Sequence, residues 1–103
     1  MKFSIRFSWA SFNWNGYRHW KDHGHEFSSL QNAKQYVEST KNFTQFPPAG
    51  TLTKIRPNGD IIFYEPSSNT FAITNQQGLP RTMYKPDPSI HNYSTNLDYF
   101  YGQ

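Results

Sequence analysis

The 103-residue sequence contains no cysteine, few charged residues and no long apolar segment. Without cysteine, neither disulfide bonds nor thiolate metal sites can form, so packing must supply the stability of the fold. No apolar run approaches the roughly 20 residues that a membrane span requires, and the N-terminus lacks the apolar core of a signal peptide. We therefore expect a soluble protein that does not interact with a membrane.

Aromatic residues make up about half of the hydrophobic residues of the sequence. They make up 18% of the residues, and all hydrophobic residues together make up 35%. A chain of this length fits one domain with one core. We expect a single monomeric domain over residues 1–103, in which rings supply most of the buried area. The net charge of +3 favours an anionic partner, of which nucleic acid is the commonest.

The first half of the chain has one strand pattern and two helix patterns. Residues 2–8 alternate between apolar and polar side chains, which predicts a half-buried strand. Residues 17–23 predict a short helix. A longer helix is expected over 28–41, because Ser28 and Gln31 have the spacing of a capping box.

The second half predicts four strands joined by short turns. Segments 51–56 and 60–65 flank Pro57-Asn58-Gly59, where Asn-Gly suits a tight hairpin. Further strands are expected at 70–74 and 81–84, after turns rich in Ser, Asn and Gly. The sequence therefore predicts an α+β fold, with N-terminal helices packed on one face of a four-stranded antiparallel meander and the other face free to bind a ligand.

Three of the four histidines, His19, His23 and His25, fall within seven positions. An imidazole can take or give a proton near neutral pH. RNA supplies its own nucleophile, the 2′-hydroxyl, so a base, an acid and a cation suffice to cleave it. The cluster therefore suggests acid-base cleavage of RNA without a metal or another cofactor.

Two other interpretations of the histidines remain open. His19 and His23 are four residues apart, a spacing at which two helical histidines can hold a metal, although Trp20 stands where a zinc protease has Glu. A metal-dependent nuclease that uses His19, His23 and His25 is therefore one alternative. The other is a non-catalytic RNA- or protein-binding module in which the histidines are structural.

Basic residues occur on the predicted strands. Lys54 and Arg56 are two residues apart and so share one face of their strand. Arg81, Thr82 and Lys85 lie at the end of the meander. Both groups are candidates for contacts with phosphate, although a solvated sheet face would show the same pattern.

A series of segments resembles the bacterial toxin and phage nucleases grouped as barnase/EndoU/colicin/RelE-like, and the order of the segments is the specific part. The segments are HWKDHGHEF at 19–27, YV at 36–37, GDIIFY at 59–64, NTFAI at 69–73 and GLPRTMYKP at 78–86. The resemblance implies N-terminal helices over a four-stranded antiparallel sheet. It also implies a toxin domain, delivered by a larger bacterial effector of the contact-dependent inhibition or Rhs type, that acts in the target-cell cytoplasm.

The activity that the resemblance implies is a metal-independent ribonuclease, often directed at tRNA, with a cognate immunity protein. It implies a catalytic His23, with Arg81, Thr82 and Lys85 handling phosphate. We expect the immunity protein to be acidic, because charge complementarity speeds the capture of a basic enzyme. The full set of candidate catalytic residues is His19, His23, His25, Arg81, Thr82 and Lys85. The candidate RNA-binding residues are Lys54, Arg56, Tyr84 and His91.

Overall fold

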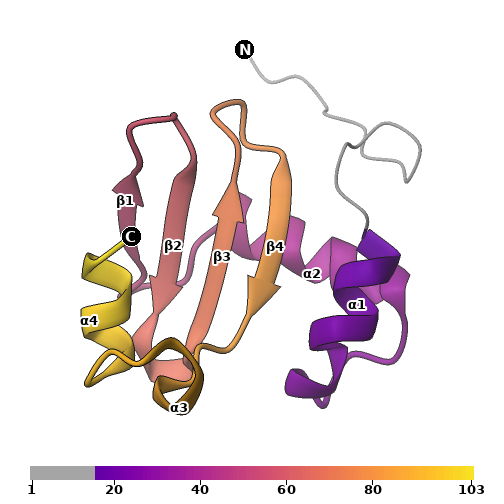
Figure 1. Ribbon diagram of the computed structural model, residues 1–103. Coiled ribbons are helices and arrows are strands. Elements are labelled where there is room, and N and C mark those ends of the chain that lie inside the picture. The colour runs from indigo at the N-terminus through magenta and orange to yellow at the C-terminus, as the bar shows by residue number, and fades with distance from the viewer. Residues whose placement is uncertain (1–15) are drawn as a thin grey trace.

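The computed structural model describes residues 16–103, which form helices packed on both faces of a four-stranded sheet (Figure 1). The helices are α1 (Gly16–His23), α2 (Ala33–Gln45), α3 (Pro88–His91) and α4 (Asn96–Tyr101). The strands are β1 (Leu52–Ile55), β2 (Ile61–Glu65), β3 (Thr70–Thr74) and β4 (Pro80–Tyr84). They are antiparallel and lie in the order β1-β2-β3-β4, so the predicted α+β meander is confirmed. The strand predicted at 2–8 lies outside the described residues.

Helix α2 begins four residues later than its sequence predicts, so the expected start at Ser28 is wrong. Asn32 is the capping residue, and its side chain accepts a hydrogen bond from the Gln35 N–H at 2.8 Å. The Gln35 side chain in turn accepts from the Gln31 N–H. The cap therefore lies one turn further along the chain, and the Gln35 side chain bonds the residue before the cap rather than the cap itself. None of the helices in residues 16–103 is long and apolar enough to cross a membrane.

The hairpin between β1 and β2 follows the predicted turn. Ile55 pairs with Ile61, and Gly59 takes a φ of +93°, which favours glycine. The Asn58 side chain accepts from the Asp60 N–H at 2.9 Å and so closes the turn. Short turns of this kind fix the register of the whole meander.

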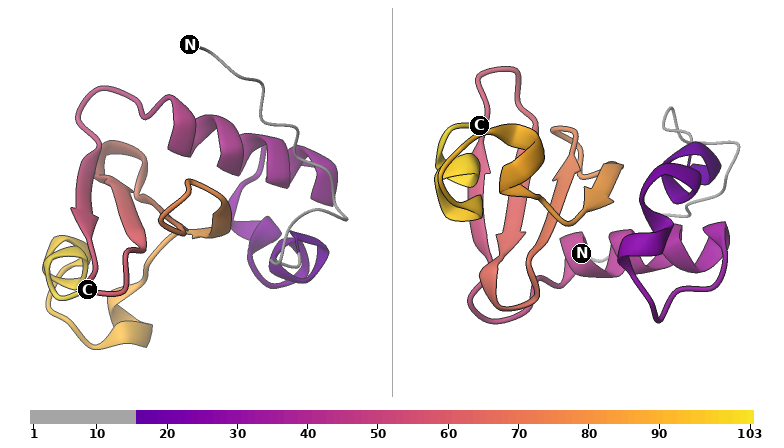
Figure 2. Two further views of the ribbon diagram at one scale, coloured as in Figure 1. Left: turned by 90° about the horizontal axis from the view of Figure 1, so that it is seen from above. Right: turned by 60° about the horizontal axis from the view of Figure 1, so that its bottom comes forward.

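One face of the sheet packs against α1 and α2. Its buried core consists of Tyr36, Phe43, Phe63, Ala72 and Met83. Seen from above, α2 runs along this face while α4 lies on the opposite side (Figure 2). The helical half of the chain therefore positions α1 at the β4 edge of the sheet, where the two make direct contacts.

The second sheet face is not free, which corrects the expectation of an open binding surface. Helix α4 places Phe100, 2% exposed, on this face. The cluster around it consists of Ile62, Tyr64, Phe71, Ile73 and Phe100. The apolar residues of β2 and β3 are consecutive in sequence and so point to both faces, which requires a cover on each side.

Tyr36 joins α2 to the outer edge of β4. Its hydroxyl donates to the Met83 carbonyl at 2.6 Å and accepts from the Met83 N–H at 3.0 Å. Burial raises the pKa of Tyr36 to about 12. A single hydroxyl thus replaces the strand that would otherwise pair with these two groups.

The substitution Tyr36→Phe should lower the free energy of unfolding by about 1–3 kcal/mol, because it leaves two buried backbone groups unpaired. Urea unfolding followed by circular dichroism measures this change. Tyr17→Phe is the matched control, because Tyr17 is 59% exposed, and it should leave the midpoint unchanged. Equal midpoints for the two variants would show that the hydroxyl does not stabilise the β4 edge.

Candidate functional site

His23, the last residue of α1, forms a hydrogen-bonded pair with Glu26. The two atoms joined are His23 Nδ1 and Glu26 Oε2, 2.9 Å apart, and the side chains are 29% and 20% exposed. Because a carboxylate only accepts, Nδ1 carries the proton and Nε2 keeps its lone pair. Among residues 16–103, Nε2 has no hydrogen-bond partner. The pair therefore presents an oriented, partly exposed imidazole that can accept a proton.

The turn Gly24–Glu26 brings Glu26 back beside His23. Gly24 is buried against the Trp20 ring, and a Cβ at this position would overlap the ring atoms. Glu26 also reaches the sheet, because its Oε1 accepts from the Lys85 N–H at 2.6 Å. The carboxylate thereby fixes the histidine relative to the end of β4.

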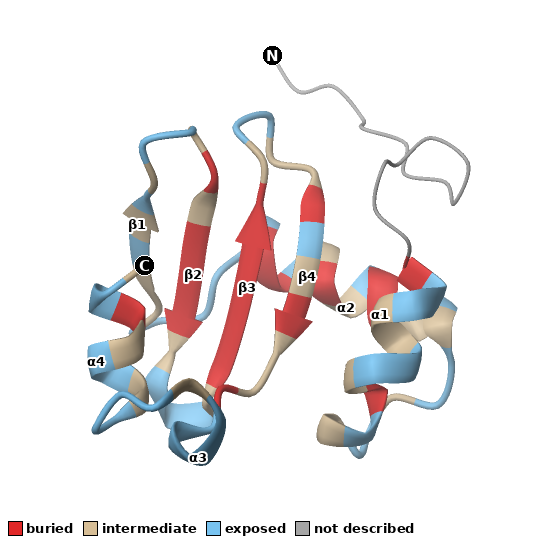
Figure 3. Ribbon diagram, viewed as in Figure 1, coloured by how far each residue is buried: buried red, intermediate tan, exposed pale blue. Residues whose placement is uncertain are grey.

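A cavity of about 180 Å³ opens between the end of α1, the end of β4 and the segment that carries α3 and α4. Helix α3 lies at the end of the sheet where β4 finishes (Figures 1 and 2). Its residues and much of the last turn of α1 are at the surface (Figure 3), so the cavity is open to solvent. It is lined by His23, Glu26, Tyr84, Lys85, Pro86, Asp87, Ile90, His91 and Tyr99.

Four rings follow one another around the cavity. His23 stacks on Tyr84, with ring centroids 5.4 Å apart. The Tyr84 and Tyr99 hydroxyls are 2.6 Å apart, and the Tyr99 ring stacks on His91 with centroids 4.2 Å apart. Burial, together with the hydrogen bond to Tyr99, raises the pKa of Tyr84 above its usual value. The walls are therefore flat and largely apolar, which suits a stacked ring.

His91 is held in a way that differs from His23. Its Nδ1 accepts from the Tyr93 N–H at 3.1 Å, and its Nε2 lies 2.8 Å from Asn96 Oδ1. A ring that accepts at Nδ1 and donates at Nε2 is neutral. His91 therefore lines the cavity with the face of its ring, while both of its nitrogens are occupied.

The other two histidines of the cluster lie outside this lining. His19 stacks on His23 with centroids 6.2 Å apart. Burial lowers the pKa of His19, and the charges of His23 and Arg18 lower it further, while Asp22 acts in the opposite direction. His25 is exposed. In the described part of the chain, no three His, Asp or Glu side chains converge as a metal site requires.

Lys85 lines the cavity, and its ammonium is fixed by neighbours. Its Nζ donates to the Ser68 carbonyl at 2.7 Å and lies 3.4 Å from Thr70 Oγ1. It also lies over the Phe27 ring, 4.9 Å from the centroid. An ammonium has three protons, so these two hydrogen bonds leave one donor for a ligand.

Arg81 and Thr82, the predicted partners of Lys85, lie near the start of β4 and are not among the cavity residues that the structure describes. Arg81 Nε forms an ion pair with Asp60 Oδ1 at 3.3 Å. Thr82 pairs with Ile73 of β3 and is half-buried. The two residues share a strand with Tyr84 but do not meet His23 at the cavity.

Lys54 and Arg56 contact the C-terminal end of the chain. Lys54 Nζ donates to the Tyr101 carbonyl at 2.5 Å, and Arg56 donates to Gln103 Oε1 at 2.8 Å. Cations at the C-terminus of a helix offset its dipole and its unpaired carbonyls. These two side chains therefore hold α4 on the sheet, and neither is among the described lining residues of the cavity.

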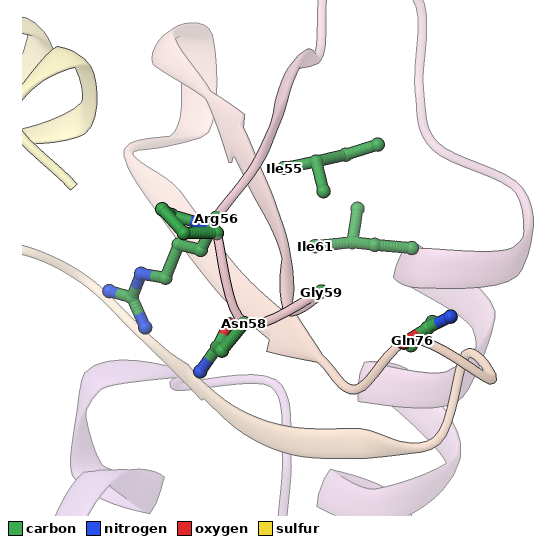
Figure 4. Close-up of a pocket in the computed structure, with 7 residues that line it drawn as sticks. Ile55, Arg56, Asn58, Gly59, Ile61 and Gln76 are labelled. Carbon is green, nitrogen blue, oxygen red and sulfur yellow. The ribbon is translucent and has the colours of Figure 1, made fainter.

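A second hollow, of about 460 Å³, lies between the β1–β2 and β3–β4 turns (Figure 4). The Arg56 guanidinium points away from Ile55 and Ile61, which line it. Its other lining residues are Pro57, Asn58, Gly59 and Gln76. The lining contains no proton carrier, so the smaller cavity at His23 is the candidate active site.

The pKa of His19 should lie below the usual histidine value of about 6.5, because burial disfavours its charged form. His23→Gln should raise it, because His23 lowers the His19 pKa when its own ring is protonated, and Lys34→Ala, on exposed surface, should leave it unchanged. Since the folded state disfavours the proton, this residue should reduce stability as the pH falls below about 6.5. An NMR titration of the imidazole protons measures these values. A His19 pKa above 6.5 would contradict the burial.

Comparisons with known proteins do not assign the chain to a family. No protein-family model matches it, and no curated protein matches it either. The resemblance to the barnase/EndoU/colicin/RelE-like nucleases therefore rests on the order of the quoted segments, and function has to be argued from the site.

Proposed function

We propose that this protein is a metal-independent endoribonuclease that cleaves RNA by transesterification from the 2′-hydroxyl. The observation that carries the proposal is the His23–Glu26 pair, which faces an open cavity with Nε2 unoccupied among residues 16–103. Glu26 holds the imidazole in one tautomer and stabilises the charge that the ring acquires on taking a proton. This is the role that a general base needs to activate a hydroxyl nucleophile.

The cavity walls support RNA as the substrate. Tyr84, Tyr99 and His91 line the cavity with aromatic atoms, against which a base can pack whatever its sequence context. The Lys85 ammonium, which Ser68 and Thr70 hold beside the lining, adds positive charge near the cavity, which favours a phosphate there. The net charge of +3 favours encounter with a polyanion.

The biological setting follows from the resemblance. We propose a toxin domain that a larger bacterial effector delivers into a target cell, where it cleaves tRNA or another structured RNA. A cognate immunity protein with an acidic face would cover the cavity and its surroundings. Lys85 and the exposed rim at Ile90 are the surfaces that such an inhibitor must block.

The purified protein should cleave tRNA in excess EDTA, leaving 2′,3′-cyclic phosphate and 5′-hydroxyl ends. His23→Gln should reduce the cleavage rate by about 10²–10⁴, the range for loss of a general base. His25→Gln should retain the rate, because His25 is exposed and outside the described cavity lining. Gel mapping of the RNA ends measures both effects.

Three results would contradict the proposal in different ways. Unchanged cleavage by His23→Gln would remove the base assigned here. Activity that is lost in EDTA and restored by zinc would replace acid-base cleavage with metal-dependent cleavage. Tight RNA binding with no cleavage by the unmodified protein would make it a binding module.

A further inference from the structure

The Tyr84 and Tyr99 hydroxyls carry one proton each, and the hydrogen bond between them uses only one of the two. The two oxygens are 2.6 Å apart, and only one of the two phenol protons can lie between them. Within residues 16–103, neither hydroxyl has another hydrogen-bond partner. One phenol proton is therefore free to be donated to a bound molecule.

The environment of the two rings indicates which phenol keeps this proton. The Tyr84 ring lies between His23 and Phe71, with centroids 5.4 and 5.0 Å away. The raised pKa of Tyr84, caused first by burial and then by its bond to Tyr99, fits a hydroxyl that donates. Either hydroxyl can donate in this bond; with Tyr84 assigned as the donor, Tyr99 accepts and keeps its own proton at the cavity wall.

The other proton carriers around the cavity are less suited to act as an acid. Both nitrogens of His91 are occupied, and both oxygens of Glu26 accept hydrogen bonds. Hydrogen bonds from Ser89 lower the pKa of Asp87, which keeps this carboxyl ionised near neutral pH. The Lys85 ammonium is held at Ser68 and Thr70, neither of which is among the described lining residues of the cavity.

We propose that Tyr99 is the general acid of the cleavage reaction and that Tyr84 is a positioning residue that holds it. This assignment rests on the ribonuclease function proposed above. His23 Nε2 takes the proton of the 2′-hydroxyl as the 2′-oxygen forms its bond to phosphorus. The bond from phosphorus to the 5′-oxygen breaks, and Tyr99 protonates this leaving oxygen. The imidazolium then returns its proton to the phenolate through solvent, so that both groups regain their starting states.

The assignment predicts a chemical rescue. On ordinary RNA, Tyr99→Phe should lower kcat by about 10²-fold, within the range for loss of an acid, with little change in KM because the ring that lines the cavity is retained. On a substrate whose leaving 5′-oxygen is replaced by sulfur, which departs without a proton, the variant should cleave within a few-fold of the unmodified protein. His23→Gln should remain slow on both substrates, because the base is still required.

Two further variants serve as controls. Tyr101→Phe removes an exposed hydroxyl from the same helix and should leave both rates unchanged. Tyr84→Phe keeps the Tyr99 hydroxyl but removes its donor, so it should lower kcat by about tenfold with the same rescue by sulfur. It also provides the test if Tyr99→Phe fails to fold, which thermal unfolding would reveal.

The outcomes separate the two proposals. Equal slowing of Tyr99→Phe on the oxygen and sulfur substrates would show that Tyr99 does not protonate the leaving group, while cleavage through His23 would stand. A Tyr84→Phe variant that cleaves both substrates equally slowly would likewise show that Tyr99 does not protonate the leaving group. No cleavage of either substrate by the unmodified protein would remove the ribonuclease function and the acid assignment together.

Discussion

The site depends on two hydrogen bonds that the Glu26 carboxylate accepts. One oxygen bonds His23 Nδ1 and the other bonds the Lys85 N–H, so a single side chain joins the end of α1 to the end of β4. The first bond fixes the tautomer of the imidazole, and the second fixes its position relative to the sheet. If the proposed ribonuclease function holds, a site built this way needs little reorganisation to bind RNA, because its groups are oriented in advance.

The same edge of the sheet is bonded a second time, by Tyr36. Its hydroxyl occupies the N–H and the carbonyl of Met83, two residues before the backbone group that Glu26 bonds. Side chains from the helical half thus satisfy alternate positions along the outer edge of β4. This arrangement protects an edge that could otherwise pair with another chain. It also explains how helices from the N-terminal half of the chain place His23 at the end of the last strand.

The fold could be predicted largely from sequence, because its signals are local. The third strand lies at Thr70–Thr74 as predicted, since turn residues bound it on both sides. The start of α2 was misplaced because Ser28 and Asn32 both have glutamine three residues later, and only Asn32 caps the helix. The cover on the second sheet face was missed because a short C-terminal segment, with Phe100 as its anchor, has too weak a helical pattern to predict its packing.

The site depends on pairings between distant segments, which sequence does not reveal. The sequence predicts phosphate contacts for three cations, Lys54, Arg56 and Arg81. In the structure, the first two hold the C-terminal end of the chain and the third forms an ion pair with Asp60. In the proposed ribonuclease, cations that are already paired in this way contribute less to phosphate binding than their number suggests. In the proposed ribonuclease, the ring walls supply much of the contact with RNA, because packing against rings requires no unpaired charge. This gives the abundance of aromatic residues a role beyond the core: the rings that close the second sheet face continue, through the Tyr99 ring, into the wall of the cavity.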